Sequence, residues 1–201
     1  MNSIDAAKPD VWRLFVAVDL PIEVKRRLEQ VQRELKQASW RARWTNPENA
    51  HLTLKFIGDF AVDSVEALSS TLRESLRSEA SFEISTSAPG AFPNFHRPRV
   101  IWLGIEDRLG SLAKTANRIE VATRSLGIEP DERAFRAHLT IARVRPQDSG
   151  TITNVDKHFA RIGRLDHLRF AVDHVTLYQS ELNRSGPTYT VIERFELRNS
   201  S

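Results

Sequence analysis

The same tripeptide occurs twice in the chain, each time inside an apolar, strand-like segment. HLTLKFIG covers residues 51–58, and HLTIARVR covers residues 138–145. Successive side chains of a β-strand point to opposite faces. In the first segment, His51, Thr53 and Lys55 should therefore share one face, with the apolar side chains on the other. The repeat predicts two strands that each place an imidazole beside a hydroxyl.

In the second segment the same alternation puts His138, Thr140 and Ala142 on one face. A rigid strand with one apolar face and one polar face is a suitable platform for chemistry. A solvent-facing sheet also accommodates one His-x-Thr pair without any function, but two copies followed by an aliphatic residue favour a functional role. The other histidines have no repeated context, and we expect them to be structural or surface residues: His96, His158, His167 and His174.

Apolar periodicity along the chain predicts strands that alternate with helices. The predicted strands cover residues 13–20, 51–57, 82–88, 99–105, 135–144, 168–180 and 188–197. The predicted helices are marked by apolar stripes at 24–35, 65–76, 109–126 and 152–162, with Asp63 and Glu66 as a capping box and Gly127 as a stop. Three prolines and a glycine make 89–98 a loop, and 181–187 is the turn of a terminal hairpin. With the repeat, this order predicts an α+β protein of two similar lobes.

The 201 residues and the 40% apolar composition suit one compact domain, or two small lobes that share a cleft. Apolar runs fall far short of the roughly 20 residues that a bilayer span needs. The N-terminus lacks a basic start followed by an apolar stretch, so we expect a cytoplasmic protein without membrane association. We also expect a monomer. The chain has no cysteine, which excludes disulfides and a cysteine nucleophile. The net charge of +3 mildly favours anionic partners.

Two imidazoles that titrate near neutrality can act as base and acid in one turnover. Two threonine hydroxyls can donate hydrogen bonds to charged oxygens of the group between them. A tetrahedral phosphorus that is attacked in line with its leaving group needs these four functions in an opposed arrangement, so the predicted substrate is a phosphoester. This chemistry requires no metal or other cofactor, and the sequence has no obvious carboxylate or cysteine cluster at ligand spacing.

The paired His-x-Thr-x motifs at 51–54 and 138–141 resemble the signature of the 2H phosphoesterase superfamily. The flanking segments RLFVAVDLP, NPENAHLTLKFIGD, FPNFHRPRVIWLGI, FRAHLTIARVR and VTLYQSELNRSGPTYTV resemble the bacterial and archaeal RNA 2′,3′-cyclic phosphodiesterases, also called 2′-5′ RNA ligases. The resemblance runs from about Trp12 to Leu197. It implies one bilobal domain over 1–201 with an ordered core at about 12–197.

The implied fold has two pseudo-symmetric antiparallel sheets, flanked by helices, that face each other across a central cleft. The implied activity is hydrolysis of RNA 2′,3′-cyclic phosphate ends, or of cyclic nucleotides, to 2′-phosphomonoesters, with reverse joining of RNA ends as a side activity. The resemblance makes His51 the proton donor and His138 the proton acceptor, although pseudo-symmetry leaves the reverse open. Thr53 and Thr140 would bind phosphate oxygens. Proline commonly precedes the second histidine in the family; Ala137 stands there in this chain.

Four further residues are candidates for substrate binding. Arg143 is the family-like candidate for phosphate or nucleotide binding, but strict alternation turns it away from the second histidine, so it reaches the cleft only at a strand end or a bulge. Phe15, Trp44 and Phe92 are candidates for stacking on a terminal base. Burial in the core is the competing interpretation for each of these rings.

Two other functions stay open at this point. A relative within the superfamily would hydrolyse another phosphoester, such as a 2′-5′ oligonucleotide or a cyclic nucleotide derivative. A non-catalytic module would bind RNA ends without turnover, although both motifs are intact.

Overall fold

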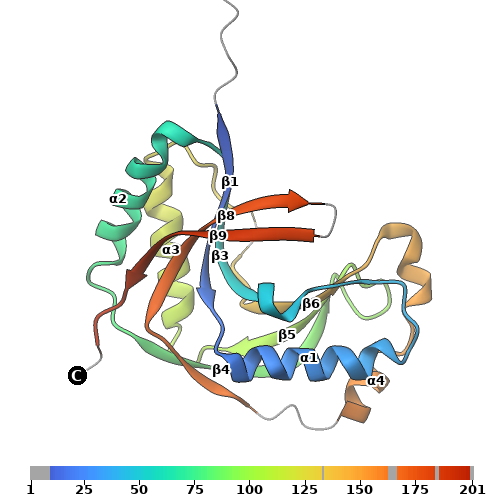
Figure 1. Cartoon of the computed structure of the whole chain (residues 1–201). Coiled ribbons are helices and arrows are strands. Elements are labelled where there is room, and N and C mark those ends of the chain that lie inside the picture. The colour runs from blue at the N-terminus through green and yellow to red at the C-terminus, as the bar shows by residue number, and fades with distance from the viewer. Residues whose placement is uncertain (1–9, 133, 163–166, 184–185, 200–201) are drawn as a thin grey trace, which may run out of the picture.

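Two antiparallel sheets and four α-helices form the computed structural model, which describes residues 10–132, 134–162, 167–183 and 186–199 (Figure 1). The first sheet has the strand order β3-β1-β8-β9 and the second has the order β2-β6-β5-β4-β7. The strands are β1 (Val11–Asp19), β2 (Arg43–Trp44), β3 (His51–Ala61), β4 (Phe82–Phe92), β5 (Val100–Glu106), β6 (His138–Arg143), β7 (Arg169–Val172), β8 (His174–Asn183) and β9 (Gly186–Glu196). The helices are α1 (Ile22–Lys36), α2 (Val65–Leu76), α3 (Ser111–Arg124) and α4 (Val155–Ile162). The predicted α+β class and the two antiparallel sheets are confirmed.

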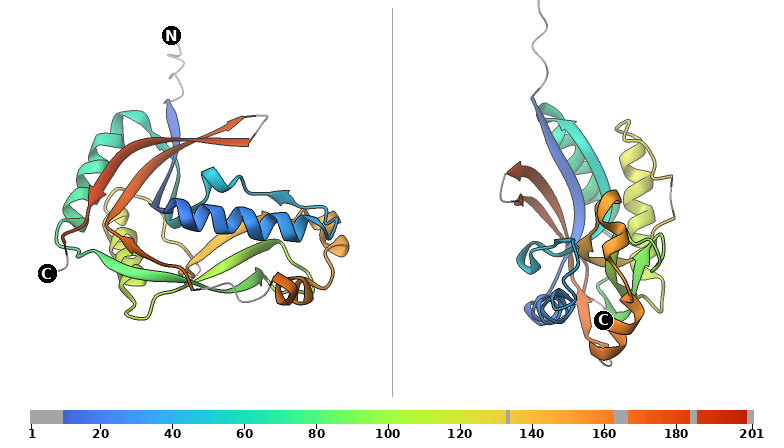
Figure 2. Two further views of the ribbon diagram at one scale, coloured as in Figure 1. Left: turned by 60° about the horizontal axis from the view of Figure 1, so that its bottom comes forward. Right: turned by 90° about the vertical axis from the view of Figure 1, so that its right-hand side faces the viewer.

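The two lobes are not the two halves of the chain. The first sheet takes strands from both ends of the sequence, and the second takes β2 from between β1 and β3. Helices α2 and α3 lie side by side against the first sheet, whereas α1 and α4 contact each other beside the second (Figures 1 and 2). The chain therefore crosses between the sheets repeatedly, and each sheet depends on segments that are distant in sequence.

The prediction of a loop over 89–98 is wrong at its start, because β4 continues to Phe92. Pro89 has no N–H for the ladder, and the strand accommodates it with a register shift between Ser87 and Pro89. The prediction of one strand over 168–180 is also wrong. Asp173 separates β7 in the second sheet from β8 in the first, and an apolar pattern that continues across the break does not reveal it.

The helix ends differ from the predictions in detail. Ser64, without a side-chain cap, precedes α2, so the predicted capping box that starts at Asp63 does not form. Gly127 follows α3 with φ +74°, which is the left-handed conformation predicted for a stop residue. Helix α4 begins at Val155 rather than near Ile152. Residues 184–185 of the predicted turn lie outside the described residues.

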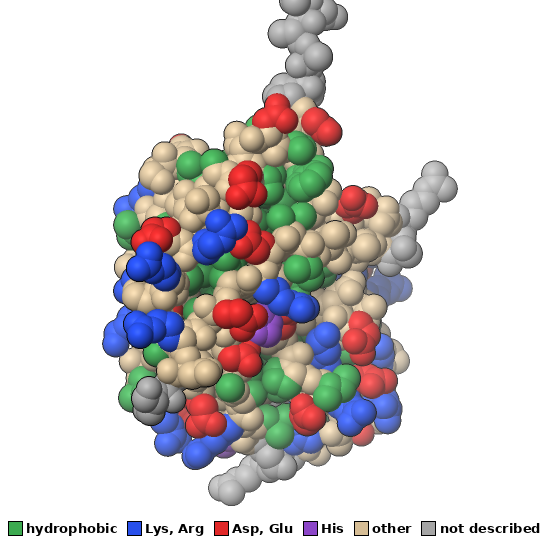
Figure 3. All heavy atoms as spheres, turned by 60° about the vertical axis from the view of Figure 1, so that its left-hand side comes forward, with side chains coloured by type: hydrophobic (Ala, Val, Ile, Leu, Met, Phe, Trp, Pro, Cys, Tyr) green, Lys and Arg blue, Asp and Glu red, His purple; other side chains and the backbone are tan. Residues whose placement is uncertain are grey.

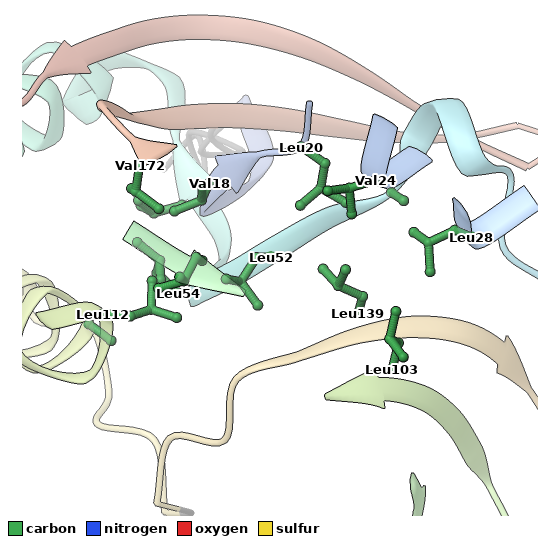
Figure 4. Packing of buried hydrophobic residues seen from close by; sticks show 14 of the residues in the cluster. Val18, Leu20, Val24, Leu28, Leu52, Leu54, Leu103, Leu112, Leu139 and Val172 are labelled. Carbon is green, nitrogen blue, oxygen red and sulfur yellow. The ribbon is translucent and has the colours of Figure 1, made fainter. Parts of the chain in front are cut away.

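The apolar members of both repeated motifs belong to one buried cluster that spans the two sheets. Leu52 and Leu139, which follow the two histidines, are fully buried in it (Figure 4). The apolar stripe of α1, represented by Val24 and Leu28, packs into the same cluster (Figure 4). Burial of these leucines fixes the register of each motif strand, because a slip of one residue would expose them.

On the face of the molecule seen in Figure 3, basic and acidic side chains are interspersed rather than separated. Arginines of α2 and α3 pair with carboxylates of neighbouring segments, among them Arg73 with Glu193 of β9 at 2.8 Å and Arg118 with Glu79 at 2.8 Å. The positive excess of the chain is therefore not gathered into a single basic patch on this face. None of the helices within the described ranges is long and apolar enough to cross a membrane.

Lys55 is the main departure from the predicted strand faces. Its side chain is 1% exposed and points into the protein, not to the face of His51. The ammonium lies 2.7 Å from the Glu120 carboxylate and 3.5 Å from that of Asp131, and it donates a hydrogen bond of 2.8 Å to the Glu129 carbonyl. This cluster ties β3 to α3 and to the segment that leads towards β6.

Lys55→Met should lower the free energy of unfolding by about 3–5 kcal/mol, because it leaves the largely buried Glu120 carboxylate without its closest partner. Urea denaturation measures the loss. The double variant Lys55→Met/Glu120→Gln should recover part of it, since the remaining group is neutral. The control is Arg33→Met, which removes an exposed ion pair with Glu29 and should cost less than about 1 kcal/mol. Equal losses for Lys55→Met and Arg33→Met would contradict this account.

Candidate active site

The two motif histidines begin strands β3 and β6, in different sheets, and are held in the same way. Nδ1 of His51 lies 2.9 Å from the carbonyl oxygen of Asn49, and Nδ1 of His138 lies 2.7 Å from that of Arg136. Each carbonyl belongs to the residue two positions earlier. A carbonyl only accepts hydrogen bonds, so Nδ1 carries the proton in both rings and Nε2 is the nitrogen left to exchange a proton.

A β-bulge follows the threonine in both motifs. Against the neighbouring strand, Leu54 in β3 and Ile141 in β6 are each the extra residue at a register shift. A bulge of this kind changes the face on which the following residues lie. The predicted alternation therefore holds up to each threonine and fails beyond it. Lys55 and Ala142 are buried instead of sharing the histidine face.

Strict alternation would turn Arg143 away from His138. The bulge at Ile141 instead brings Arg143 to the face of His138, which is one of the two exceptions that the sequence allowed. The guanidinium charge lowers the pKa of both His138 and His51, so one arginine lies within electrostatic range of both imidazoles. Strands β3 and β6 are also in direct contact. The two motifs thus adjoin one positively charged centre.

Phe56 occupies in β3 the position that Arg143 occupies in β6, five residues after the motif histidine. Its ring is 56% exposed and its centroid lies 6.3 Å from that of Phe15. The sequence prediction placed Phe56 on the buried face. The bulge at Leu54 reverses this and leaves an apolar ring exposed beside the first histidine.

Each motif histidine packs against aromatic rings from neighbouring strands. The His51 ring lies 4.6 Å from Phe15 and 5.1 Å from Tyr189, measured between centroids. The His138 ring lies 5.1 Å from Phe92 in an edge-on arrangement and 6.2 Å from Trp102. These contacts and the carbonyl hydrogen bonds fix the orientation of both imidazoles.

The three aromatic residues predicted to stack on a base lie in different surroundings. Phe92 lies in the site, against the second histidine. Phe15 also lies in the site but is only 3% exposed, so its ring supports His51 and has little face left for a base. Trp44 pairs with the fully buried Ala142 and packs against the core, with the Lys36 ammonium 5.7 Å from its ring centroid. Trp44 therefore lies on the opposite face of β2 from Arg43, and its role in base stacking stays a prediction.

The hydroxyls of Thr53 and Thr140 are partly exposed, on the same faces as the histidines. Within the described ranges, neither hydroxyl has a hydrogen-bond partner in the protein. Both are therefore available to donate to a ligand. Among the described residues there is no group of three or more His, Cys, Asp or Glu side chains that could hold a metal ion.

Asp19 forms a polar network beside the first motif that the sequence analysis did not identify. It is paired with His51 in the register of β1 and β3. Its carboxylate accepts hydrogen bonds from Nε2 of His174 at 2.9 Å, from the Thr176 hydroxyl at 3.0 Å, and from the Tyr178 hydroxyl. Alternation along β1 would have placed Asp19 on the Phe15 face, but its partners are about 155 residues away in the chain.

Partial burial raises the pKa of Asp19, but the hydrogen bonds from His174, Tyr178 and Thr176 outweigh this effect and lower it to about 2. The same contact with Asp19 raises the pKa of His174. At neutral pH, Asp19 is therefore a fixed negative charge next to the first motif. His174, which was expected to be a structural or surface residue, helps to hold this charge through its hydrogen bond to Asp19.

The imidazoles of His51 and His138 are electrostatically similar but not equivalent. Burial lowers the pKa of both below the ordinary value, the carbonyl hydrogen bonds raise it in part, and Arg143 lowers it. The negative charge of Asp19 raises the pKa of His51 only. Because a negative charge favours the protonated imidazole, Asp19 distinguishes the first histidine from the second.

A model of the protein family described as LigT-like phosphoesterase matches this chain twice, at residues 18–102 and 103–189. The RNA 2′,3′-cyclic phosphodiesterase of Methanothermobacter thermautotrophicus is 35% identical over 92% of this chain and 98% of that protein. The protein of the same name from Archaeoglobus fulgidus is 32% identical over 92% of this chain and 99% of its own length.

Solved structures agree with these matches. TT0787 of Thermus thermophilus superimposes with a TM-score of 0.76 and 28% identity, covering 94% of this chain and 100% of the other. Escherichia coli LigT complexed with 3′-AMP superimposes with a TM-score of 0.72 and 25% identity, covering 94% of this chain and 99% of the other.

Titration of the histidine ring protons by NMR should give pKa values below about 6.5 for both His51 and His138. In Asp19→Asn the pKa of His51 should fall further, because the carboxylate that favours its protonated form is lost. His138 in the same spectra is the internal control and should not move. An unchanged pKa of His51 in this variant would contradict the electrostatic difference between the two rings.

Proposed function

Because this chain belongs to the LigT-like phosphoesterase family, we propose that it hydrolyses the 2′,3′-cyclic phosphate at the end of an RNA strand to a 2′-phosphomonoester. The observation that carries the proposal is the matched pair of imidazoles. In each, Nδ1 is engaged with a carbonyl and Nε2 has no hydrogen-bond partner among the residues that the structure describes, and both rings lie near the same guanidinium. Curated relatives named RNA 2′,3′-cyclic phosphodiesterase support the choice of substrate.

In the proposed reaction, Nε2 of His138 takes a proton from water as the water oxygen bonds to phosphorus. The bond between phosphorus and O3′ breaks, and Nε2 of His51 gives its proton to O3′. The phosphate stays on O2′. Asp19 supports this assignment of roles, because its charge favours a protonated His51 as the acid.

Charge that develops on the phosphoryl oxygens needs donors that are fixed before the reaction. The unpartnered hydroxyls of Thr53 and Thr140 and the guanidinium of Arg143 are the candidates for this task. Proton transfer and charge stabilisation then come from side chains alone, and the proposal assigns no step to a metal ion.

The same site would join RNA ends if a 5′-hydroxyl replaced the water. The 5′ oxygen would bond to phosphorus, His138 would take its proton, and O3′ would leave with a proton from His51, which gives a 2′-5′ phosphodiester. We include this ligation in the proposed function as a side reaction.

We also propose that residues 12–197 act as one catalytic unit. The two motif strands belong to different sheets, and both sheets contain strands from distant parts of the chain. Gln32 of α1 donates hydrogen bonds to the carbonyls of Thr45, at 2.6 Å, and Ile141, at 3.1 Å. These links support a fixed arrangement of the two motifs.

His51→Ala and His138→Ala should each lower kcat/KM for adenosine 2′,3′-cyclic monophosphate by about 10²–10⁴-fold, because each removes a proton-transfer group. Thermal unfolding checks that both variants stay folded. His158→Ala, on α4 against Trp40, is the control and should keep wild-type turnover.

Chromatography should identify the 2′-phosphate product, and a chelator should leave the rate unchanged. Full activity in either motif variant would refute the mechanism, and turnover of 2′-5′ oligonucleotides alone would indicate the other phosphoester class.

The plot of kcat/KM against pH should be bell-shaped, with its maximum at or below about pH 6.5. The base must be neutral, so the rate falls as the pH drops below the pKa of His138. The acid must be protonated, so the rate falls as the pH rises above the pKa of His51. Burial lowers both pKa values, which moves the maximum towards acid. A rate that is constant from pH 5 to pH 8 would exclude two-histidine catalysis.

A further inference from the structure

Two arginines face each other across neighbouring strands at the edge of the site. Arg43 of β2 is the direct partner of Arg143 of β6 in the antiparallel register, so both side chains lie on the same face of the second sheet. Like charges in this position destabilise a sheet. In the described part of the chain, no carboxylate lies within 4 Å of either guanidinium. Elsewhere on the surface, arginines such as Arg73 and Arg118 do have carboxylate partners.

Arg43 is exposed, and its guanidinium reaches towards the first sheet. One of its Nη atoms lies 3.8 Å from where a Cβ on Gly186, the first residue of β9, would be. The same end of β9 is linked to the segment before β3, because Asn49 donates a hydrogen bond of 2.9 Å to the Pro187 carbonyl. The charges of both arginines act on Tyr189, the ring that contacts His51. Arg43 thus borders the same site as the two motif histidines.

An uncompensated pair of guanidiniums is stabilised by a bound anion, and the planar guanidinium suits phosphate oxygens. In the proposed function, Arg143 serves the cyclic phosphate, because it is close to both imidazoles. Arg43 is one strand further from them, on the outermost strand of its sheet. An RNA end has a second anion close to the cyclic phosphate, namely the phosphodiester that joins the terminal nucleotide to its 5′ neighbour.

We propose that Arg43 binds this neighbouring phosphodiester, so that the site distinguishes the end of an RNA chain from a free cyclic mononucleotide. The inference rests on the proposed function, which concerns only the cyclic phosphate. It adds a contact to the phosphodiester on the 5′ side of the terminal nucleotide. Because β2 is an edge strand, an RNA strand longer than one nucleotide can leave the site over it. Arg43 is then a specificity-determining residue that takes no part in proton transfer.

The experiment compares adenosine 2′,3′-cyclic monophosphate with the dinucleotide ApA that has a 2′,3′-cyclic end, which adds one 5′ adenosine and the phosphodiester that joins it. In Arg43→Gln the ratio of kcat/KM for the dinucleotide to that for the mononucleotide should fall about tenfold, the effect of losing one charged hydrogen bond to phosphate. Arg43→Lys should restore part of the ratio. Arg77→Gln, which removes an exposed charge beyond α2, is the matched control and should leave the ratio unchanged.

Two measurements separate this role from a structural one. The thermal midpoint of Arg43→Gln should equal or exceed that of the wild type, because a like-charge pair is relieved. In the wild type, the plot of log kcat/KM against log salt should be steeper for the dinucleotide, by up to about 0.7, and Arg43→Gln should remove the difference. A variant ratio equal to that of the wild type, or an equal loss on both substrates, would overturn the inference.

Binding of the two 2′-phosphate products, measured by calorimetry, distinguishes the inference from the proposed function. If the wild-type protein turns over neither substrate, the proposed function fails. The role of Arg43 then stands only if Arg43→Gln weakens binding of the dinucleotide product and not of the mononucleotide product. Equal binding of both products by the wild type and the variant would refute it independently of catalysis.

Discussion

The geometry of the site depends on one extra residue after each threonine. The bulges at Leu54 and Ile141 leave the histidine and threonine on one face and reverse the faces of the residues that follow. Without the second bulge, Arg143 would point away from the imidazoles. A bulge takes a carbonyl out of the regular ladder, and a buried carbonyl needs a partner. The Ile141 carbonyl accepts hydrogen bonds from the backbone N–H of Thr45 and from the buried side chain of Gln32.

Two similar motifs do not make a symmetric site. Both imidazoles are oriented by a carbonyl two residues earlier, and the charge of Arg143 lowers the pKa of both. The difference comes from their neighbours. Asp19, held as a carboxylate by three donors, lies beside the first motif only. Repeated sequence therefore supplies the matched groups, and the contact of Asp19 with β8 supplies the electrostatic difference between the two imidazoles.

The sequence was sufficient to predict the class of fold, the strands that carry the motifs, and the shared faces of each histidine and its threonine. These follow from local periodicity, which burial of Leu52 and Leu139 enforces. The bulges were not predictable, because the pattern through Leu54 and Ile141 also fits regular alternation, and only the burial of Lys55 and Ala142 shows the shift. The two-residue strand β2 is too short to leave a pattern, so the opposed pair of arginines was missed. Asp19 was missed because its hydrogen-bond partners lie about 155 residues away.

The two matches to the family meet between Trp102 and Leu103, in the middle of β5. Across the second sheet, strands from the first repeat alternate with strands from the second, and β5 contains parts of both. One repeat alone thus lacks the partners to complete either sheet. A half-length version of this chain could build such a site only as an interlocked pair of copies that exchange strands. A cut of this chain at the repeat boundary would yield two fragments that must fold together.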